Sequence, residues 1–176
     1  MRPASTFVEL DKTYHDRKGF DCGTEQLNSF LQQFAARHRA AGINKTMVLP
    51  SKGNGVDICA YYTLSHTEIG RQTLPKTIAK KLPHYPIPVM LIAQLAVSEL
   101  AQGQGLGKVT LINALKHCYA INQHLPSNAV VVDALVQGVQ GVQGFYEQYG
   151  FQILDTEDDK IRLFLPMGTV GRLFTS

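Results

Sequence analysis

The chain of 176 residues lacks the patterns that mark a secreted or membrane-inserted protein. Charged residues interrupt any apolar run near its start, at Arg2, Glu9, Asp11 and Lys12. This argues against a signal peptide. The longest apolar stretch, 89–97, is much shorter than the about 20 residues that a membrane-spanning helix needs. We therefore expect a cytoplasmic protein that does not enter a membrane.

Signatures of disulfide and metal sites are missing as well. Cys22, Cys59 and Cys118 are odd in number and widely spaced, with no C-x-x-C pair, and the six histidines form no H-E-x-x-H motif. This pattern favours reduced, mostly core cysteines and predicts no metal centre. No local signature supports a catalytic pair of cysteine and histidine.

Composition and periodicity predict one mixed α/β domain over residues 1–176. Hydrophobic residues make up 44% of the chain and charged residues 18%, which fits a globular protein with a substantial core. We expect strands at 5–10, 46–50, 58–64, 89–97, 129–135, 151–154 and 161–166. We expect one or two helices at 23–41, further helices at 77–82, 108–121 and 144–149, and a closing helical turn at 167–174.

The first of these helices has Thr24 as its expected N-cap. Its apolar residues fall on one face and are therefore expected in the core: Leu27, Phe30, Leu31, Phe34 and Ala35. The segment 51–57 is rich in Gly, Asn and Asp, which indicates a hairpin between two strands.

Acidic residues are absent from two long stretches, 26–56 and 69–98, although the net charge is only +3. A basic surface of this kind suits a polyanion such as nucleic acid. The candidate contacts are Arg37, Lys45, Lys76, Lys80 and Lys81. The alternative is the ordinary solvated surface of a slightly basic protein.

Alternating glycines, Gly103, Gly105 and Gly107, follow an apolar run and precede a helical pattern. Glycine allows positive φ, so backbone amides can converge on an anion, and a helix N-terminus favours phosphate. A P-loop is excluded because Gln102 and Val109 occupy its glycine and hydroxyl positions. The dinucleotide fingerprint is excluded because the third glycine comes one residue early. What remains is Q-x-x-G-x-G, with an ordinary glycine-rich turn as the alternative.

The Q-x-x-G-x-G pattern resembles the acetyl-CoA-binding motif of the GCN5-related N-acetyltransferases (GNAT). Residues 145–151 resemble the F-Y-x-x-x-G-F signature near the C-terminus of that superfamily. Residues 20–31 and 86–89 resemble one branch, the acetyltransferase toxins of bacterial toxin–antitoxin modules. The resemblance spans nearly the whole chain. It implies a single-domain GNAT fold with a mixed, mostly antiparallel sheet that is splayed at strand 4 and flanked by helices.

The resemblance also implies a reaction and its partners. Acetyl-CoA would be the cosubstrate, charged tRNA the acceptor through the α-amino group of its amino acid, and a ribbon-helix-helix antitoxin the neutralising partner. The pantetheine arm would lie along Leu95, Ala96 and Val97. The pyrophosphate would bind the segment Gln102, Gly103, Gln104, Gly105, Leu106, Gly107 and Lys108. The sequence leaves open whether two copies form a homodimer.

Tyr146 is the candidate general acid for direct transfer in a ternary complex. By resemblance, this tyrosine contacts the coenzyme sulfur. The phenol, with a pKa near 10, stays protonated at working pH, and an α-amino group with a pKa of roughly 7.7–8.0 needs no dedicated strong base. The alternative role for Tyr146 is a core aromatic. Other open functions are acetylation of a small-molecule amine or a protein N-terminus, and non-catalytic binding of a phosphate ligand.

Two departures from the family pattern stand out. Where relatives usually carry Asp or another polar residue after Leu-Ala-Val and a basic residue next, this chain has Ser98 and Glu99, which weakens a capping role for residue 98. A Val-Gln-Gly repeat fills 136–144. Repeated glycines disfavour regular helix, so we expect loop or frayed turn there, with the extra residues bulging at 136–141 and Tyr146 left in place.

Overall fold

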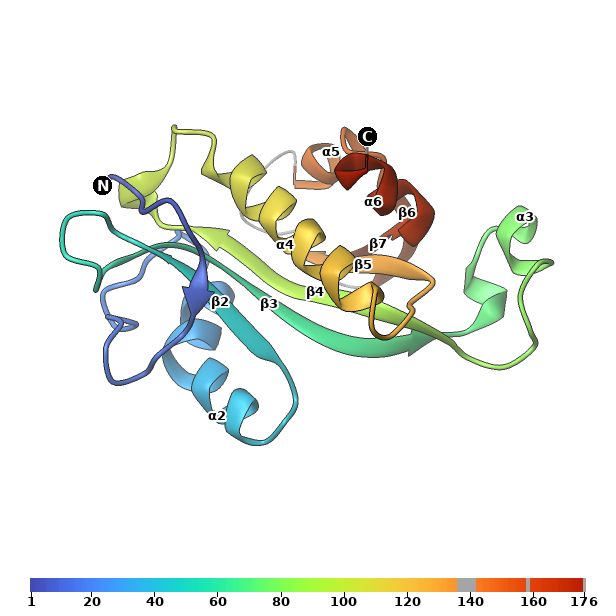
Figure 1. The fold of residues 1–176 in the computed structure, drawn as a ribbon, viewed down its shortest axis with the longest axis horizontal. Helices are drawn as coiled ribbons and strands as arrows, with labels where there is room; N and C mark the ends of the chain where they lie inside the picture. Colours follow the sequence, from blue (N-terminus) through green and yellow to red (C-terminus); the bar gives the residue numbers. More distant parts are fainter. Residues whose placement is uncertain (136–141, 158, 176) are drawn as a thin grey trace. The chain divides into compact units, whose positions relative to one another are not determined.

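The computed structural model describes residues 1–135, 142–157 and 159–175 (Figure 1). Its seven-stranded sheet has the order β1-β2-β3-β4-β5-β7-β6. The strands are β1 (Val8–Glu9), β2 (Lys45–Pro50), β3 (Ile58–Ile69), β4 (Ile87–Val97), β5 (Ala129–Leu135), β6 (Gln152–Glu157) and β7 (Lys160–Pro166). The helices are α1 (Glu25–Ser29), η1 (Phe30–Phe34), α2 (Ala35–Ala40), η2 (Arg71–Thr73), α3 (Lys76–Ala79), η3 (Glu99–Ala101), α4 (Leu106–Asn122), α5 (Val142–Glu147) and α6 (Met167–Phe174).

The mixed, mostly antiparallel α/β fold expected from the sequence is confirmed. β4 and β5 pair in parallel, whereas β1–β2, β2–β3, β5–β7 and β6–β7 are antiparallel. The parallel ladder joins only residues 90–92 to 130–132. Such a short ladder is what a splayed fourth strand predicts. No helix in the described ranges is long and apolar enough to cross a membrane.

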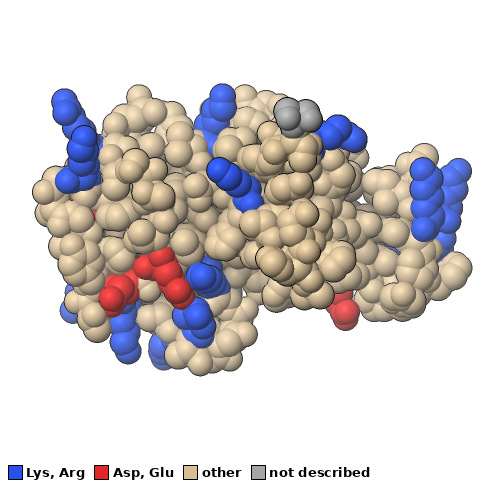
Figure 2. Space-filling model, viewed as in Figure 1, with Lys and Arg blue, Asp and Glu red and all other residues tan. Residues whose placement is uncertain are grey.

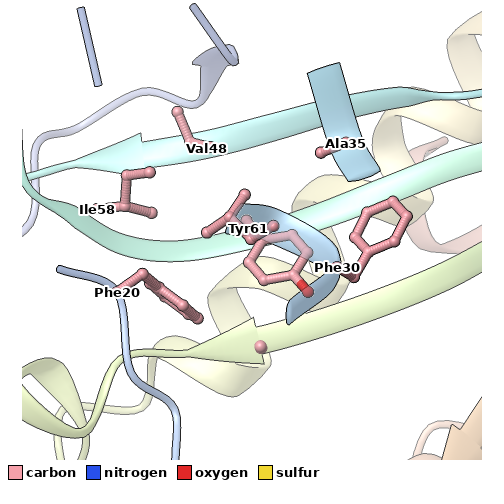
Figure 3. Close-up of a cluster of buried hydrophobic side chains, with 8 residues drawn as sticks. Phe20, Phe30, Ala35, Val48, Ile58 and Tyr61 are labelled. Carbon is pink, nitrogen blue, oxygen red and sulfur yellow. The ribbon is translucent and has the colours of Figure 1, made fainter. Parts of the chain in front are cut away.

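The chain divides into two compact units, the first comprising residues 1–65 and 93–114. In this unit α2 packs against β2 (Figure 1). A buried cluster brings Phe30 and Ala35 from the helices together with Val48 and Tyr61 from the strands (Figure 3). Thr24 is the N-cap of α1, as predicted, but its hydroxyl makes no capping hydrogen bond.

The prediction that Phe34 lies in this core is wrong. Leu31 and Ala35 are 0% and 1% exposed, whereas Phe34 is 40% exposed. The cause is η1, a π-helical turn over residues 30–34, which breaks the 3.6-residue periodicity on which the prediction relied. Phe34 ends this turn with a φ of −114°, and α2 restarts at Ala35.

The second unit comprises residues 66–92 and 115–176. Its strands β5 and β7 pair from Ala129 opposite Pro166 to Leu135 opposite Lys160, and α6 packs on both strands (Figure 1). The α3 segment joins this unit through a buried cluster that includes Leu74, Val89 and Phe164.

One expectation about the Val-Gln-Gly repeat needs correction, and another falls outside the described residues. Residues 142–144 begin α5, which therefore starts two residues earlier than predicted and is not loop there. The side-chain amide of Gln143 donates to the Glu147 carboxylate at 2.6 Å, an i,i+4 pair that supports the turn. The bulge expected at 136–141 lies outside the described residues.

Candidate coenzyme and acceptor site

The glycine loop of the first unit has the geometry of an open anion cradle. Gly103 and Gly105 have φ values of +82° and +76°, and a Cβ at either position would meet no atom within 4 Å. The loop is exposed and leads into α4, whose first-turn amides have no acceptor within the helix. Gly107 does not share the positive φ expected from the sequence, because α4 begins at Leu106 and includes it.

The two glutamines of the loop bind protein carbonyl groups. Gln102 Nε2 donates to the Val97 carbonyl at 3.1 Å. Gln104 Nε2 donates to the carbonyl groups of Ala101 at 3.0 Å and Met1 at 2.8 Å. Both side chains therefore hold the loop in place. An anion would contact the backbone amides.

The candidate thioester strand, 95–97, is built into the same unit. Ala96 is 5% exposed and belongs to the cluster around Phe30 and Tyr61, whereas Val97 packs with the cluster that contains Leu106. The backbone amide of Ser98 donates to the Cys59 carbonyl at 2.8 Å. Ser98 precedes η3 without a side-chain capping hydrogen bond, in agreement with the weak capping role expected of it.

Tyr146 lies in the second unit and is 5% exposed. Its ring packs edge-on against Phe145 at 5.1 Å and Phe151 at 5.6 Å between ring centroids. Burial raises the pKa of the Tyr146 phenol, so the group stays protonated over the physiological range. Among the described residues its hydroxyl has no hydrogen-bond partner. A buried aromatic ring whose O–H has no partner in the described part of the chain fits both roles that the sequence left open.

The candidate basic contacts of the first unit differ in how they are engaged. Lys45 Nζ lies 3.8 Å from a Glu9 carboxylate oxygen, and Arg39 Nε lies 2.6 Å from the other. Arg37 instead places its guanidinium carbon 5.4 Å from the centroid of the Phe34 ring. In the described part of the chain it forms no ion pair, so it is the stronger candidate of the two that the sequence proposed.

The three candidate lysines of the second unit gather around α3. Lys76, Lys80 and Lys81 are exposed. Figure 2 shows Lys and Arg side chains at the end that carries α3 in Figure 1, without acidic side chains among them on the visible face. A cavity of about 790 Å³ beside them is also lined by Arg71 and His84, which the sequence did not single out as site residues. The Arg71 Nε donates to the Ala79 carbonyl at 2.7 Å, which orients the guanidinium.

The cysteines carry no sign of a reactive thiol. Burial raises the pKa of Cys118 to about 12 and also raises the pKa of Cys22 and Cys59, so these thiols stay protonated. Within residues 1–135, 142–157 and 159–175, no three His, Cys, Asp or Glu side chains come together as a metal-binding group.

Similar sequences connect this geometry to a family, although no family model matches the chain. A probable toxin TacT of Sinorhizobium fredii is 27% identical over 169 residues, which cover 93% of this chain and 92% of that protein. A tRNA-acetylating toxin of Mycobacterium tuberculosis is 27% identical over 152 residues and 86% of each chain.

Solved structures give a wider match. AtaTR with bound acetyl-CoA is 30% identical, with a TM-score of 0.81 over 97% of this chain and 98% of that one. AtaT in complex with acetyl-methionyl-tRNA is 29% identical, with a TM-score of 0.84 over 97% and 99%. A tyrosine-to-phenylalanine variant of AtaT, bound to acetyl-CoA and the C-terminus of the antitoxin AtaR, is 25% identical, with a TM-score of 0.78 over 97% and 98%. The glycine loop, the fold and these relatives agree, and the chain belongs to the GNAT acetyltransferase toxins of toxin–antitoxin modules.

Proposed function

We propose that this protein acts in the cytoplasm as a single acetyltransferase domain, residues 1–176, that moves acetyl from acetyl-CoA to the α-amino group of aminoacyl-tRNA. The observation that carries the proposal is the open loop at Gly103 and Gly105, set between the 95–97 strand and the start of α4. Two relatives support the acceptor, since one is named a tRNA-acetylating toxin and another holds acetyl-methionyl-tRNA. Acetylation of the amino acid would block translation.

The coenzyme would bind through backbone groups. The amides of 103–108 would hold the pyrophosphate, because the positive φ at Gly103 and Gly105 leaves the loop open and the helix N-terminus favours negative charge. The backbone of Leu95, Ala96 and Val97 would pair with the pantetheine arm as an added strand does. One amide of this strand would hold the thioester oxygen and stabilise the oxyanion as it develops.

Tyr146 would supply the proton of the leaving group. The neutral α-amine attacks the thioester carbonyl carbon, the C–S bond breaks, and the thiolate sulfur takes the phenolic proton. The nitrogen loses its extra proton to solvent, and the tyrosinate then regains a proton from water. No dedicated base is needed, because an α-amine with a pKa of roughly 7.7–8.0 is partly neutral at pH 7. The burial of Tyr146, and the lack of a hydrogen-bond partner for its hydroxyl among the described residues, support this role.

The test is transfer of labelled acetyl from acetyl-CoA to purified charged tRNA. Tyr146→Phe should slow transfer with little change in acetyl-CoA affinity, because phenylalanine keeps the ring packing and removes only the acid. A wild-type protein that binds acetyl-CoA but acetylates no charged tRNA contradicts the proposal.

The basic α3 segment supplies a second test of the acceptor. Substitution of Lys76, Lys80 and Lys81 with Glu should abolish acetylation of tRNA, because the exposed ammonium groups are the proposed phosphate contacts. The same variant should keep activity on a cationic small-molecule amine. If transfer to tRNA survives the charge reversal, the tRNA phosphates are bound elsewhere on the protein.

An antitoxin is the proposed regulatory partner. AtaT binds the antitoxin AtaR in a related structure. The ribbon-helix-helix class is our expectation for the partner of this chain. A neighbouring reading frame that encodes such a protein, and whose product abolishes acetyl transfer on mixing, is the expected finding. The sequence leaves open whether the active unit is a homodimer, and sedimentation of the active protein tests it.

A further inference from the structure

Phe34 does not lie on the buried face that the apolar pattern of its helix predicts. An aromatic ring that the apolar pattern assigns to the core is instead 40% exposed, at the end of the π-helical turn η1. Single π-turns inside α-helices are rare overall, but those that occur are often found at functional sites. An exposed ring forgoes the favourable free energy of burying apolar surface, and a ligand that covers the ring would recover it.

Arg37 turns this ring into a flat, cationic surface. Its guanidinium carbon lies over the Phe34 ring, 5.4 Å from the ring centroid, and its Nε donates to the Gln33 carbonyl at 3.1 Å, which fixes the group over one face of the ring and leaves the other face for a base. In the described part of the chain Arg37 has no carboxylate partner, whereas the nearby Arg39 and Lys45 share Glu9. Ring and guanidinium together form what we call the Phe34–Arg37 surface.

From this arrangement we propose that the Phe34–Arg37 surface stacks an unpaired nucleobase of the acceptor RNA. The proposal rests on the proposed function, in which the acceptor is charged tRNA, and it assigns a contact for the single-stranded 3′ end that carries the amino acid. Aromatic rings bind the π-face of any base, and arginine adds a cation–π term and charge for the phosphates.

The placement of the surface within the first unit agrees with this role. The His38 ring packs on Phe34 at 5.9 Å and on Phe30 at 5.6 Å between centroids, and Asn44 Nδ2 lies 3.2 Å from His38 Nδ1. Phe30 in turn belongs to the buried cluster that contains Ala96 of the proposed thioester strand. A base on Phe34 would therefore be held by the same packed cluster that positions the acetyl group.

The charge of the segment favours an anionic partner, and its single exposed ring favours a nucleobase over an apolar protein segment. The stretch 26–56 contains no acid, so no carboxylate of its own would repel a phosphate. A stacked base also needs only one exposed ring, whereas an apolar protein segment needs a continuous patch. Phe34 is such an exposed ring, and the Arg37 guanidinium lies over it.

The test uses a short single-stranded RNA ending in CCA, with fluorescent 2-aminopurine as its last base. The wild-type full chain should quench the fluorescence, because stacking on an aromatic ring quenches this base. Phe34→Leu should weaken binding by about 5- to 150-fold and relieve the quenching, whereas Phe34→Trp should keep both. Leu125→Ala is the matched control, since Leu125 is also an exposed apolar side chain, at 60%.

Acetylation of charged tRNA provides the second measurement. Phe34→Leu should raise the KM for tRNA and leave the thermal shift produced by acetyl-CoA unchanged, which shows that the variant is folded. If wild type acetylates tRNA and Phe34→Leu does so with the same KM and the same quenching, the stacking proposal is overturned while the proposed function stands. If wild type acetylates no tRNA yet quenches the probe through Phe34, the function fails and the stacking site stands. A variant that loses only antitoxin binding also overturns the stacking proposal.

Discussion

Gly103→Ala tests whether the proposed coenzyme loop requires a positive φ at residue 103, separately from any effect of side-chain volume. Gly103 has a φ of +82°, and its missing Cβ would meet no atom within 4 Å. Gly168, in α6, also leaves room for a Cβ, but its φ is not positive. Alanine at the two positions therefore differs only in the backbone conformation that it must adopt.

The magnitude follows from this difference. A left-handed conformation costs a residue with a Cβ about 1–2 kcal/mol. Reduced freedom of the unfolded chain offsets about 0.4–1 kcal/mol. Gly103→Ala should therefore lower the free energy of unfolding by up to about 1.5 kcal/mol if the loop keeps its shape. If the loop relaxes, acetyl-CoA affinity should fall by about 5- to 30-fold, because binding must restore the conformation. Gly168→Ala should instead stabilise the protein by about 0.5–1 kcal/mol.

Thermal melts with and without acetyl-CoA, together with direct titration of the coenzyme, measure both quantities. The strain must be found in one of them, since the wild-type loop geometry is the proposed binding geometry. A Gly103→Ala protein that binds acetyl-CoA like wild type and matches Gly168→Ala in its gain of stability would refute the assignment of this loop as the pyrophosphate cradle. Loss of stability in Gly168→Ala would refute the reasoning that its site is open.

Three further predictions concern titration and charge pairing. The rate of acetyl transfer should rise as the acceptor amine loses its proton near pH 7.7–8.0, and should show no fall at about pH 10, because burial raises the pKa of Tyr146; a descending limb near pH 10 in the profile of kcat would assign the acid to another group. Burial lowers the pKa of His15, whose Nδ1 accepts a hydrogen bond from the Asp11 amide at 3.0 Å. The neutral imidazole therefore contributes its full stability to the fold above about pH 6.5, and this stability is lost as the pH falls toward the lower folded-state pKa. Urea melts of His15→Gln should show a smaller loss of stability in acid than wild type, and the same dependence of stability on pH in both proteins would contradict this. Asp133→Asn should destabilise the protein by about 1–2 kcal/mol, because Arg162 donates two charge-assisted hydrogen bonds to this half-buried carboxylate at 2.7 and 2.9 Å; unchanged denaturation midpoints would show that the pair is fully screened.

Strands with a dense apolar signal could be predicted from the sequence almost to the residue. The structure has β5 at Ala129–Leu135, as predicted, because a run of β-branched residues bounded by polar turn residues admits little else. β3 continues to Ile69, five residues past its predicted end. Its last part alternates exposed and buried residues and includes a histidine and a glutamate, so composition alone hid it.

The features that the sequence missed depend on contacts between distant residues or on small changes of helix geometry. Lys45 reads as a free cation in an acid-free stretch, yet it meets Glu9 from another strand. Phe34 reads as core because a regular helix would place it there, and only the π-turn moves it out. Periodicity cannot reveal such a π-turn, because the apolar residues at 27, 30, 31, 34 and 35 have the spacing of a regular helix.

In the glycine loop, the glutamine side chains bind the protein itself, and the backbone amides are left for a ligand. Residue type alone suggests that Gln102 and Gln104 touch the coenzyme, but both side chains donate to protein carbonyls. Gln102 in particular ties the start of the loop to Val97, at the end of the strand that would hold the thioester. Because this bond exists before any ligand binds, the amides proposed for the pyrophosphate and the strand proposed for the thioester are fixed relative to each other within the first unit. Such fixed geometry removes a cost of ordering from binding, and in a reaction that needs no strong base, positioning of this kind supplies much of the rate.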